Sequence, residues 1–362
     1  VYKRQRRDLP CQVSFPYGVW RTAAKPLVGD QIGWFPLRCF SGQQAHPGQG
    51  RFVCACARGK MQVMMAAESM SGLRGDLKFN EPMSAHTSWR AGGPADRCYR
   101  PADLPDLQQF LRTLPADEPL YWVGLGSNLL VRDGGIRGTV ILPFGTLDTL
   151  ELLEGDRLRA GAGVACAKVA RFAVRAGLVG AEFLAGMPGT MGGALAMTAG
   201  AFGGETWPLV SSVRTLDRNG ELHVRAAGSY QVSYRSVAGP GDEWFVAADL
   251  QLEQGDGAAA QTRIKTLLER RSATQPTQQP SCGSVFRNPP QDFAARLIES
   301  CGLKGERIGN AQVSEKHANF IVNLGQARAA DIEALLRYVQ SQVRQQHGVW
   351  LEPEVRIIGE FE

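Results

Sequence analysis

Residues 185–194 read Ala-Gly-Met-Pro-Gly-Thr-Met-Gly-Gly-Ala, and Ala-Gly-Ala-Phe-Gly-Gly follows at residues 199–204. So few large side chains occur here that the segment offers backbone and open space rather than core packing. We predict that a flat aromatic or pyrophosphate-bearing cofactor lies against this backbone. The alternative interpretation is an irregular loop that binds nothing.

A second glycine-rich stretch lies upstream, where residues 123–130 read Val-Gly-Leu-Gly-Ser-Asn-Leu-Leu. The apolar run 120–123 just before it predicts a buried strand. Backbone N–H groups exposed after a strand, with Ser and Asn as further donors, would form an anion-binding nest. The spacing matches neither the dinucleotide-binding fingerprint nor the Walker phosphate loop. A tight turn explains Gly124 and Gly126 equally well.

Glycine is concentrated around these two stretches. The chain has 42 glycines, and 18 of them fall among the 85 residues 121–205. Glycine loses more backbone entropy on folding than any other residue. Such a density is therefore typical of backbone that must approach a ligand closely or adopt a positive φ.

The composition is that of an ordinary globular protein. The chain has 362 residues, 44% hydrophobic and 21% charged, which excludes wholesale disorder and suits two or three domains. No run approaches the roughly 18 apolar residues of a membrane-spanning helix. The eight cysteines lack the spacing of a zinc site. We expect reduced thiols, a cytoplasmic location, a monomer, no membrane partner and no metal.

The net charge of +5 belongs to the start of the chain. Residues 1–70 carry 10 Lys and Arg against 3 Asp and Glu, whereas the other 292 residues carry 30 against 32. A basic arm that binds nucleic acid is one interpretation, with residues 3–7 as its only support. We favour an unassigned extension that is disordered or lies upstream of a true start among the four methionines between residues 61 and 70. We therefore expect no nucleic-acid partner.

Beyond residue 71, short apolar runs alternate with glycine-rich turns and amphipathic helices, which predicts an α+β fold. Residues 165–176 have the apolar spacing of a helix. A clearer helix is predicted over residues 331–346, with Asp331 as its N-cap and Gly348 just beyond its end.

Two breaks divide this part of the chain. One falls near residues 144–150, between glycine-rich blocks, and the other is a linker-like Gly/Ala/Gln stretch at residues 254–261. The resulting domains are predicted at residues 71–145, 146–255 and 256–362.

Seven motifs in a consistent order resemble one family of flavoenzymes. They lie at residues 86–93, 124–131, 186–193, 234–236, 282–289, 313–320 and 351–355. Spanning about residues 78–360, they are similar to the motifs of the UDP-N-acetylenolpyruvoylglucosamine reductases. The short spacing between Arg235 and Ser284 resembles the branch of that family without an extra tyrosine-bearing insertion.

The resemblance implies a fold and a reaction. Residues 71–145 and 146–255 would be two subdomains of a vanillyl-alcohol-oxidase-type (PCMH) FAD-binding fold, followed by an α/β substrate-binding domain. The activity would be that of a UDP-N-acetylmuramate dehydrogenase of peptidoglycan precursor synthesis. NADPH would reduce FAD, and the flavin would pass hydride to C3 of the enolpyruvyl ether of UDP-N-acetylglucosamine.

Three catalytic residues follow from the motif correspondence. Arg235 would bind the substrate carboxylate, because its planar fork suits a bidentate contact. Ser284 would protonate C2 of the enolpyruvyl group. Glu354 would polarise the enol system; its apolar surroundings predict a raised pKa, whereas Glu352 should point the other way along an extended segment.

The resemblance also implies binding residues. The positions predicted to contact the cofactor are Gly124, Gly126, Ser127, Asn128, Leu129, Gly189, Thr190, Gly192 and Gly193. Asn288 and His317 are predicted to contact the UDP-sugar, and a hydrogen-bonded structural histidine is the alternative interpretation of His317. The arginines Arg270, Arg271 and Arg287 are candidates for the diphosphate, and solvated surface arginines are the alternative interpretation. Cys282 is interpreted as a packed thiol.

Two positions depart from the family pattern, since Thr198 stands where Asn is usual and Asn310 where Gly is common. The departures put local loop geometry in doubt rather than activity. An FAD oxidase or dehydrogenase of the same cofactor fold, acting on a hydroxy acid or sugar alcohol, remains the alternative function.

Overall fold

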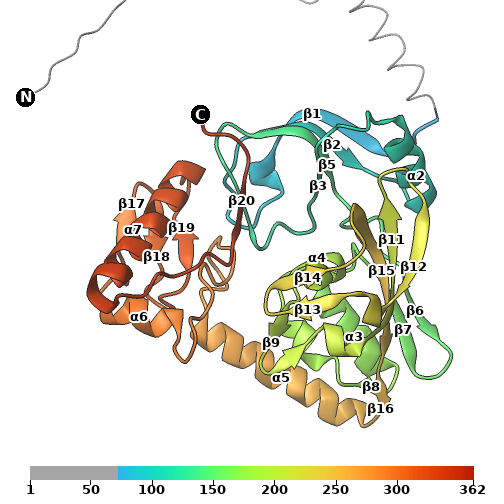
Figure 1. Cartoon of the computed structure of the whole chain (residues 1–362). Coiled ribbons are helices and arrows are strands. Elements are labelled where there is room, and N and C mark those ends of the chain that lie inside the picture. Colours follow the sequence, from blue (N-terminus) through green and yellow to red (C-terminus); the bar gives the residue numbers. More distant parts are fainter. Residues whose placement is uncertain (1–71) are drawn as a thin grey trace, which may run out of the picture. The chain divides into compact units, whose positions relative to one another are not determined.

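The structure is a computed structural model that describes residues 72–362. The extension predicted for residues 1–70 lies outside the described residues. Helices and strands alternate along the chain, so the α+β prediction is confirmed (Figure 1).

The first region contains a four-stranded sheet in the order β1-β2-β5-β3. Its strands are β1 (Asp76–Pro82), β2 (Pro94–Arg100), β3 (Leu120–Trp122) and β5 (Ile136–Ile141), with η1 (Met83–Ala85), α2 (Leu104–Thr113) and β4 (Leu129–Val131) beside them. β2 and β3 both run parallel to β5, and β3 comes last in the strand order, so it is an edge strand. Leu107 and Phe110 of α2 pack on Tyr99 and Ile141 of the sheet.

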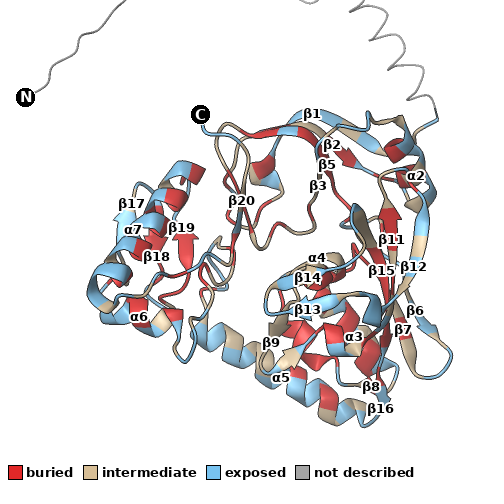
Figure 2. Ribbon diagram, in the orientation of Figure 1, coloured by how far each residue is buried: buried red, intermediate tan, exposed pale blue. Residues whose placement is uncertain are grey.

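The second region contains an antiparallel sheet in the order β12-β11-β15-β7-β6. Its strands are β6 (Leu150–Leu153), β7 (Arg157–Gly161), β11 (Val210–Asp217), β12 (Leu222–Ala226) and β15 (Glu243–Gln251). Smaller elements are α3 (Cys166–Arg175), β8 (Leu178–Val179), η2 (Glu182–Gly186), α4 (Met191–Ala196), β9 (Gly200–Ala201), β10 (Gly204–Glu205), η3 (Trp207–Leu209), η4 (Ala227–Ser229), β13 (Gln231–Ser233), β14 (Ser236–Ala238) and β16 (Glu253–Gln254). Buried residues concentrate on β11 and β15 (Figure 2).

The linker-like stretch at residues 254–261 is a correction to the sequence interpretation. Helix α5 (Gly257–Thr274) begins inside it, and Asp256 Oδ1 accepts hydrogen bonds from the N–H groups of Ala258 and Ala259. An aspartate N-cap followed by alanines favours helix. Ala260 and Ile264 are buried in the core of the second region, so α5 packs there.

The C-terminal region contains the antiparallel sheet β17 (Arg307–Ile308), β18 (Ala311–Val313) and β19 (Ile321–Asn323), with the helices α6 (Ala294–Ser300) and α7 (Ala329–His347). The apolar stripe predicted for α7 is buried, and Gly348 ends the helix at a φ of 69°. The predicted N-cap is wrong. Arg328 occupies that position, and Asp331 lies at the third helical residue, where its Oδ2 accepts from Arg328 N–H.

The C-terminal region contacts the first region through a strand pairing, a buried side chain and hydrogen bonds. Strand β20 (Arg356–Ile358) pairs in parallel with β4. Trp89, from the loop between β1 and β2, is fully buried in the core of the C-terminal region, and its Nε1 donates to Ile321 O at 2.7 Å. Asp133 accepts from the N–H groups of Ala329 and Ala330 at the start of α7. These contacts bring segments from both ends of the described chain to one place.

Candidate active site

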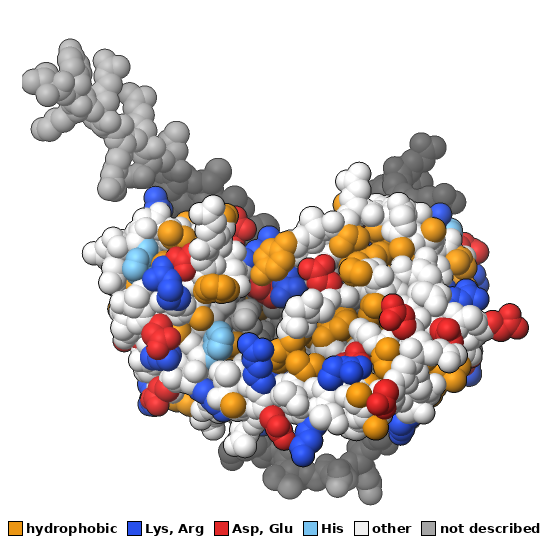
Figure 3. Space-filling view, turned by 90° about the horizontal axis from the view of Figure 1, so that it is seen from below, with side chains coloured by type: hydrophobic (Ala, Val, Ile, Leu, Met, Phe, Trp, Pro, Cys, Tyr) orange, Lys and Arg blue, Asp and Glu red, His pale blue; other side chains and the backbone are white. Residues whose placement is uncertain are grey.

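A cavity of about 820 Å³ lies where the three regions meet. Both glycine-rich stretches line it, together with residues 275–284, Arg235 and Glu354. The space-filling view shows the surface hollowed near its centre, with hydrophobic and charged side chains around the hollow (Figure 3). The two stretches that the sequence analysis singled out therefore share one site.

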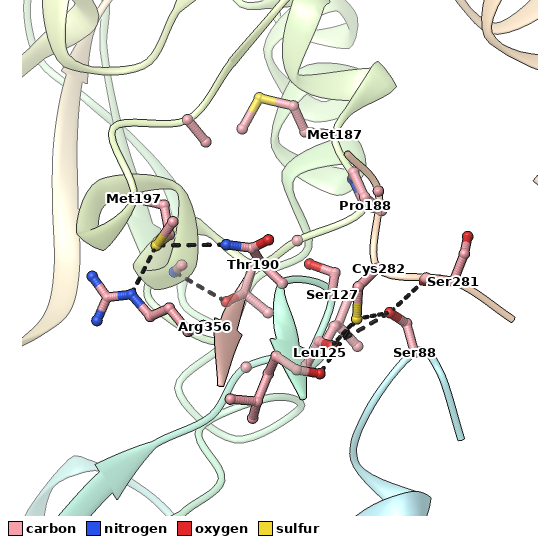
Figure 4. Close-up of a pocket in the computed structure, with 18 of the residues that line it drawn as sticks. Ser88, Leu125, Ser127, Met187, Pro188, Thr190, Met197, Ser281, Cys282 and Arg356 are labelled. Atoms are coloured by element: carbon pink, nitrogen blue, oxygen red, sulfur yellow. Dashed lines mark hydrogen bonds between the residues drawn. The ribbon is translucent and has the colours of Figure 1, made fainter. Parts of the chain in front are cut away.

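The two glycine-rich stretches touch directly. A Cβ atom added at Gly124 would lie 2.4 Å from Thr190 Oγ1, and one at Gly189 would lie 3.4 Å from Ser127 Oγ. Thr190, Ser127 and Leu125 are drawn together in Figure 4. Gly124 is thus required for close approach of the first and second regions, and not only for a turn.

Gly126 adopts the left-handed conformation with a φ of 58°, and a Cβ there would lie 2.1 Å from His86 O. Its carbonyl accepts from the thiol of Cys282 at 3.4 Å, and Ser88 Oγ donates to Ser281 O at 2.7 Å (Figure 4). Burial raises the pKa of the Cys282 thiol to about 11. The geometry agrees with the interpretation of Cys282 as a packed thiol rather than a nucleophile.

The loop from Gly124 to Asn128 presents backbone donors to the cavity. Among the described residues, none of its five N–H groups donates to a protein acceptor. The lining residues also include four arginines, Arg90, Arg235, Arg271 and Arg356, against one acid, Glu354. Free backbone donors and an excess of guanidinium groups fit an anionic dinucleotide such as FAD.

Arg235 and Glu354 form an ion pair inside this cavity. Arg235 Nε donates to Glu354 Oε1 at 2.8 Å, and the side chains are only 17% and 12% exposed. Arg235 is the second of the two residues joining β13 to β14 and has a φ of 56°. Its Nη1 also donates to Thr198 O at 3.2 Å. Residues 119 positions apart are thus brought into contact at a strained turn.

The carboxyl of Glu354 is unusual because burial raises its pKa, although neighbouring Arg235 opposes that shift. The backbone around it is held on two sides, because Glu354 N–H donates to Val285 O and Asn128 Nδ2 donates to Glu354 O. Glu352 is 69% exposed and its side chain lies near Arg287. The two acids therefore face opposite ways, as the extended segment predicts.

Ser284 lines the same cavity as Arg235 and Glu354. It follows Gly283, which has a φ of 70°, and precedes Val285, whose N–H donates to Asn319 O at 2.9 Å. Arg235 thus comes from the second region, Ser284 from the loop between α5 and α6, and Glu354 from the segment just before β20. Their roles stay predictions.

Most of the predicted cofactor residues line the cavity, including Leu129 and Gly193, but Gly192 does not. Gly192 N–H donates to Ala162 O inside the second region. The two predicted substrate residues also lie outside the lining. Asn288 Oδ1 accepts from Ala294 N–H at the start of α6. His317 packs edge-on against Phe320, and burial lowers the pKa of its imidazole.

Trp122 of β3 and Trp244 of β15 are among the cavity residues that the sequence did not single out as site residues. Their rings stack with centroids 5.5 Å apart and planes inclined by 12°. Trp122 was assigned only to a buried strand, and Trp244 was not singled out. No spacing in the sequence indicates that the two would meet, because β3 and β15 belong to different sheets.

Comparison with known proteins identifies the family. A family described as the C-terminal domain of UDP-N-acetylenolpyruvoylglucosamine reductase matches residues 275–358, and one described as an FAD binding domain matches residues 95–225. The UDP-N-acetylenolpyruvoylglucosamine reductase of Alkalilimnicola ehrlichii is 62% identical over 82% of this chain and 99% of its own length. The chain belongs to the UDP-N-acetylenolpyruvoylglucosamine reductase family.

Other members of the family agree. The reductase of Methylococcus capsulatus is also 62% identical, over 82% of this chain and 97% of its own length. The crystal structure of the Thermus caldophilus enzyme is similar, with 33% identity, a TM-score of 0.67, and coverage of 78% of this chain and 98% of that one. The expected FAD-binding fold with a C-terminal substrate domain is confirmed. This family member is an FAD-dependent oxidoreductase.

None of the helices described between residues 72 and 362 is long and apolar enough to cross a bilayer. In the same part of the chain, His, Cys, Asp and Glu residues do not gather in groups of three or more that could hold a metal ion.

Gly124→Ala should weaken FAD binding. The added Cβ would clash with Thr190 Oγ1 and push the two glycine-rich stretches apart. We expect a loss of affinity of about tenfold, the effect of roughly 1.4 kcal/mol of displaced contacts, measured by titrating apoprotein with FAD. Gly228→Ala is the control, since a Cβ at Gly228 meets nothing within 4 Å. Unchanged FAD affinity in Gly124→Ala would contradict the close-approach role.

The raised pKa of Glu354 makes one contribution to stability depend on pH. The native state holds this proton more tightly than the unfolded chain, whose pKa is near the ordinary 4.5. The contribution should therefore be complete below about pH 4.5 and be lost as pH rises through the native pKa. Urea unfolding of wild type and Glu354→Gln across pH should show their free-energy difference changing in that direction. Glu352→Gln, at a side chain that is 69% exposed, is the matched control for the effect of the substitution itself.

Proposed function

We propose that this chain reduces the enolpyruvyl ether of UDP-N-acetylglucosamine to UDP-N-acetylmuramate, at the expense of NADPH. The observation that carries the proposal is the buried Arg235–Glu354 ion pair, which shares one cavity with Ser284 and with the loop from Gly124 to Asn128. When bound, FAD supplies the transfer of hydride from NADPH to C3 of the enolpyruvyl group.

Arg235 binds the substrate carboxylate in this scheme. Hydride addition at C3 moves negative charge toward that carboxylate, and a guanidinium fork held against it stabilises the charge as it develops. The hydrogen bonds to Glu354 and to Thr198 O hold the fork in place before the substrate arrives. A preorganised donor spends no energy on reorientation during the reaction.

Ser284 supplies the proton at C2. Its Oγ–H bond breaks as a new C–H bond forms at C2, so one hydride at C3 and one proton at C2 complete the reduction. A serine hydroxyl is a weak acid in water. The positive charge of Arg235 in the same low-dielectric cavity supports loss of its proton.

Glu354 completes the arrangement. Burial keeps its pKa raised, while the ion pair with Arg235 favours its charged form. A carboxyl balanced in this way polarises the enolpyruvyl system and orients Arg235. The contacts of Asn288 and His317 with the UDP-sugar, and of arginines with its diphosphate, remain predictions. So do the domain boundaries, the cytoplasmic location, the monomeric state and the absence of a nucleic-acid partner.

The test is a spectrum followed by an assay. Purified protein should be yellow or take up FAD, and should then oxidise NADPH only when the enolpyruvyl nucleotide is present. Protein that cannot be loaded with FAD would contradict the proposal. Flavin reduction by a hydroxy acid or sugar alcohol, without turnover of the enolpyruvyl nucleotide, would support the alternative oxidase function instead.

A further inference from the structure

The Trp122–Trp244 pair lies at one end of the loop that fits a pyrophosphate. Trp122 comes two residues before Gly124, and both indoles line the cavity. The other end of the loop adjoins the proposed catalytic residues, because Asn128 Nδ2 donates to Glu354 O at 3.0 Å. The loop is thus flanked by a reactive end and an aromatic end. FAD has the same order, with its pyrophosphate between the flavin and the adenosine.

The indole of Trp122 has an unused donor. Its Nε1 is buried and has no acceptor among the described residues. A buried N–H without a partner costs free energy, so a buried donor that the protein leaves unpaired usually bonds to a ligand or to an ordered water. An adenine ring offers several nitrogen acceptors.

The backbone N–H and C=O of Trp122 also face away from the neighbouring strand. Val123 N–H donates to Ile141 O and Thr139 N–H donates to Pro119 O, so the odd-numbered residues of this segment bond to β5. The N–H and C=O of Trp122 therefore point away from β5, along the free edge of the sheet. One donor and one acceptor side by side match the edge of an adenine base.

We propose that the stacked pair of Trp122 and Trp244 forms an aromatic platform on which the adenine of FAD lies, where the first and second regions meet. The inference rests on FAD binding but not on the identity of the sugar nucleotide. A base stacked on an indole binds well because both present large flat π faces. Since one indole comes from β3 and the other from β15, this platform also makes FAD binding depend on the contact between two sheets.

The experiment compares ligands that differ in the base. Apoprotein is titrated with FAD and with FMN, which has the flavin but no adenosine. Trp122→Leu should weaken FAD binding about 10- to 100-fold, the usual effect of losing one base–aromatic stack. It should change FMN binding less than about twofold. Trp244→Leu should show the same selectivity, because it removes the ring that stacks on Trp122 and completes the platform. Trp122→Phe should fall between, because it keeps the ring face and loses the N–H.

A second measurement serves if FMN binds too weakly for its affinity to be compared. ADP has the base and the diphosphate but no flavin, so it should displace FAD from wild type and do so about tenfold less well from Trp122→Leu. Trp350→Leu is the control, because Trp350 is 53% exposed and packs against Arg344 outside the cavity. Its ligand affinities should equal those of wild type.

Three results would overturn the proposed adenine platform. Equal weakening of FAD and FMN would show that the indoles only stabilise the fold. Unchanged FAD affinity in both leucine variants would remove the adenine contact. A raised KM for the sugar nucleotide with unchanged FAD affinity would assign the indoles to the uracil. Failure of the wild type to bind FAD would instead contradict the proposed function.

Discussion

Ser284→Ala should abolish turnover of the enolpyruvyl nucleotide while NADPH still reduces the flavin at the wild-type rate. The substitution removes the proton that C2 must receive, but leaves the cavity and its glycine-rich walls intact. Loss of a positioned general acid costs about 10²- to 10⁴-fold in rate. We expect kcat for substrate reduction to fall within that range.

Stopped-flow absorbance separates the two half-reactions. Flavin bleaching by NADPH reports the first, and reoxidation by the enolpyruvyl nucleotide reports the second. Ser341→Ala is a matched control, since the Ser341 hydroxyl donates to Tyr338 O on α7, outside the lining of the cavity. Unimpaired reoxidation in Ser284→Ala would refute the proton-donor role, and equal loss of both half-reactions would indicate damage to the flavin site.

Arg235→Ala should have a comparably large effect, for two reasons. It removes the group that stabilises charge at the substrate carboxylate, which typically costs about 10²- to 10³-fold in kcat. It also leaves the Glu354 carboxylate buried without its partner, so the pKa of Glu354 should rise further. The acidic limb in the pH profile of the residual activity should therefore be displaced to higher pH.

The pH profile of kcat/KM for the enolpyruvyl nucleotide measures this displacement. Arg235→Lys is the conservative variant: it keeps the positive charge, but a lysine ammonium cannot reproduce the fork that contacts Glu354 and Thr198 O together. We expect it to restore the position of the acidic limb but little of kcat. An Arg235→Ala enzyme with wild-type kcat would remove Arg235 from the mechanism.

Local sequence patterns predicted helices and their ends correctly where interactions between neighbouring residues decide the structure. The apolar stripe of α7 and its glycine stop follow from helical periodicity and from the left-handed conformation that Gly348 adopts. The error at Asp331 has the same origin, since an aspartate suits both the N-cap and the third helical residue. The linker assigned to residues 254–261 failed because alanines after a capping aspartate form helix despite the nearby glycines.

Contacts between distant residues could not be predicted in the same way. Arg235 meets Glu354 because the β13–β14 turn and the segment before β20 converge, and β20 is placed by pairing with β4. Trp122 and Trp244 meet because the edge strand β3 faces β15 of another sheet. Neither pairing leaves a periodic signal in the sequence.

The sequence by itself determined that residues 185–194 and 123–130 would present backbone to a ligand, because glycine and small side chains leave nothing else to pack. It also determined, through motif order, the family and its cofactor. Only the tertiary structure decided that Gly124 abuts Thr190, so that the two stretches form one cavity. The physical reason is that glycine permits close approach of any backbone, whereas the choice of partner depends on how whole sheets pack.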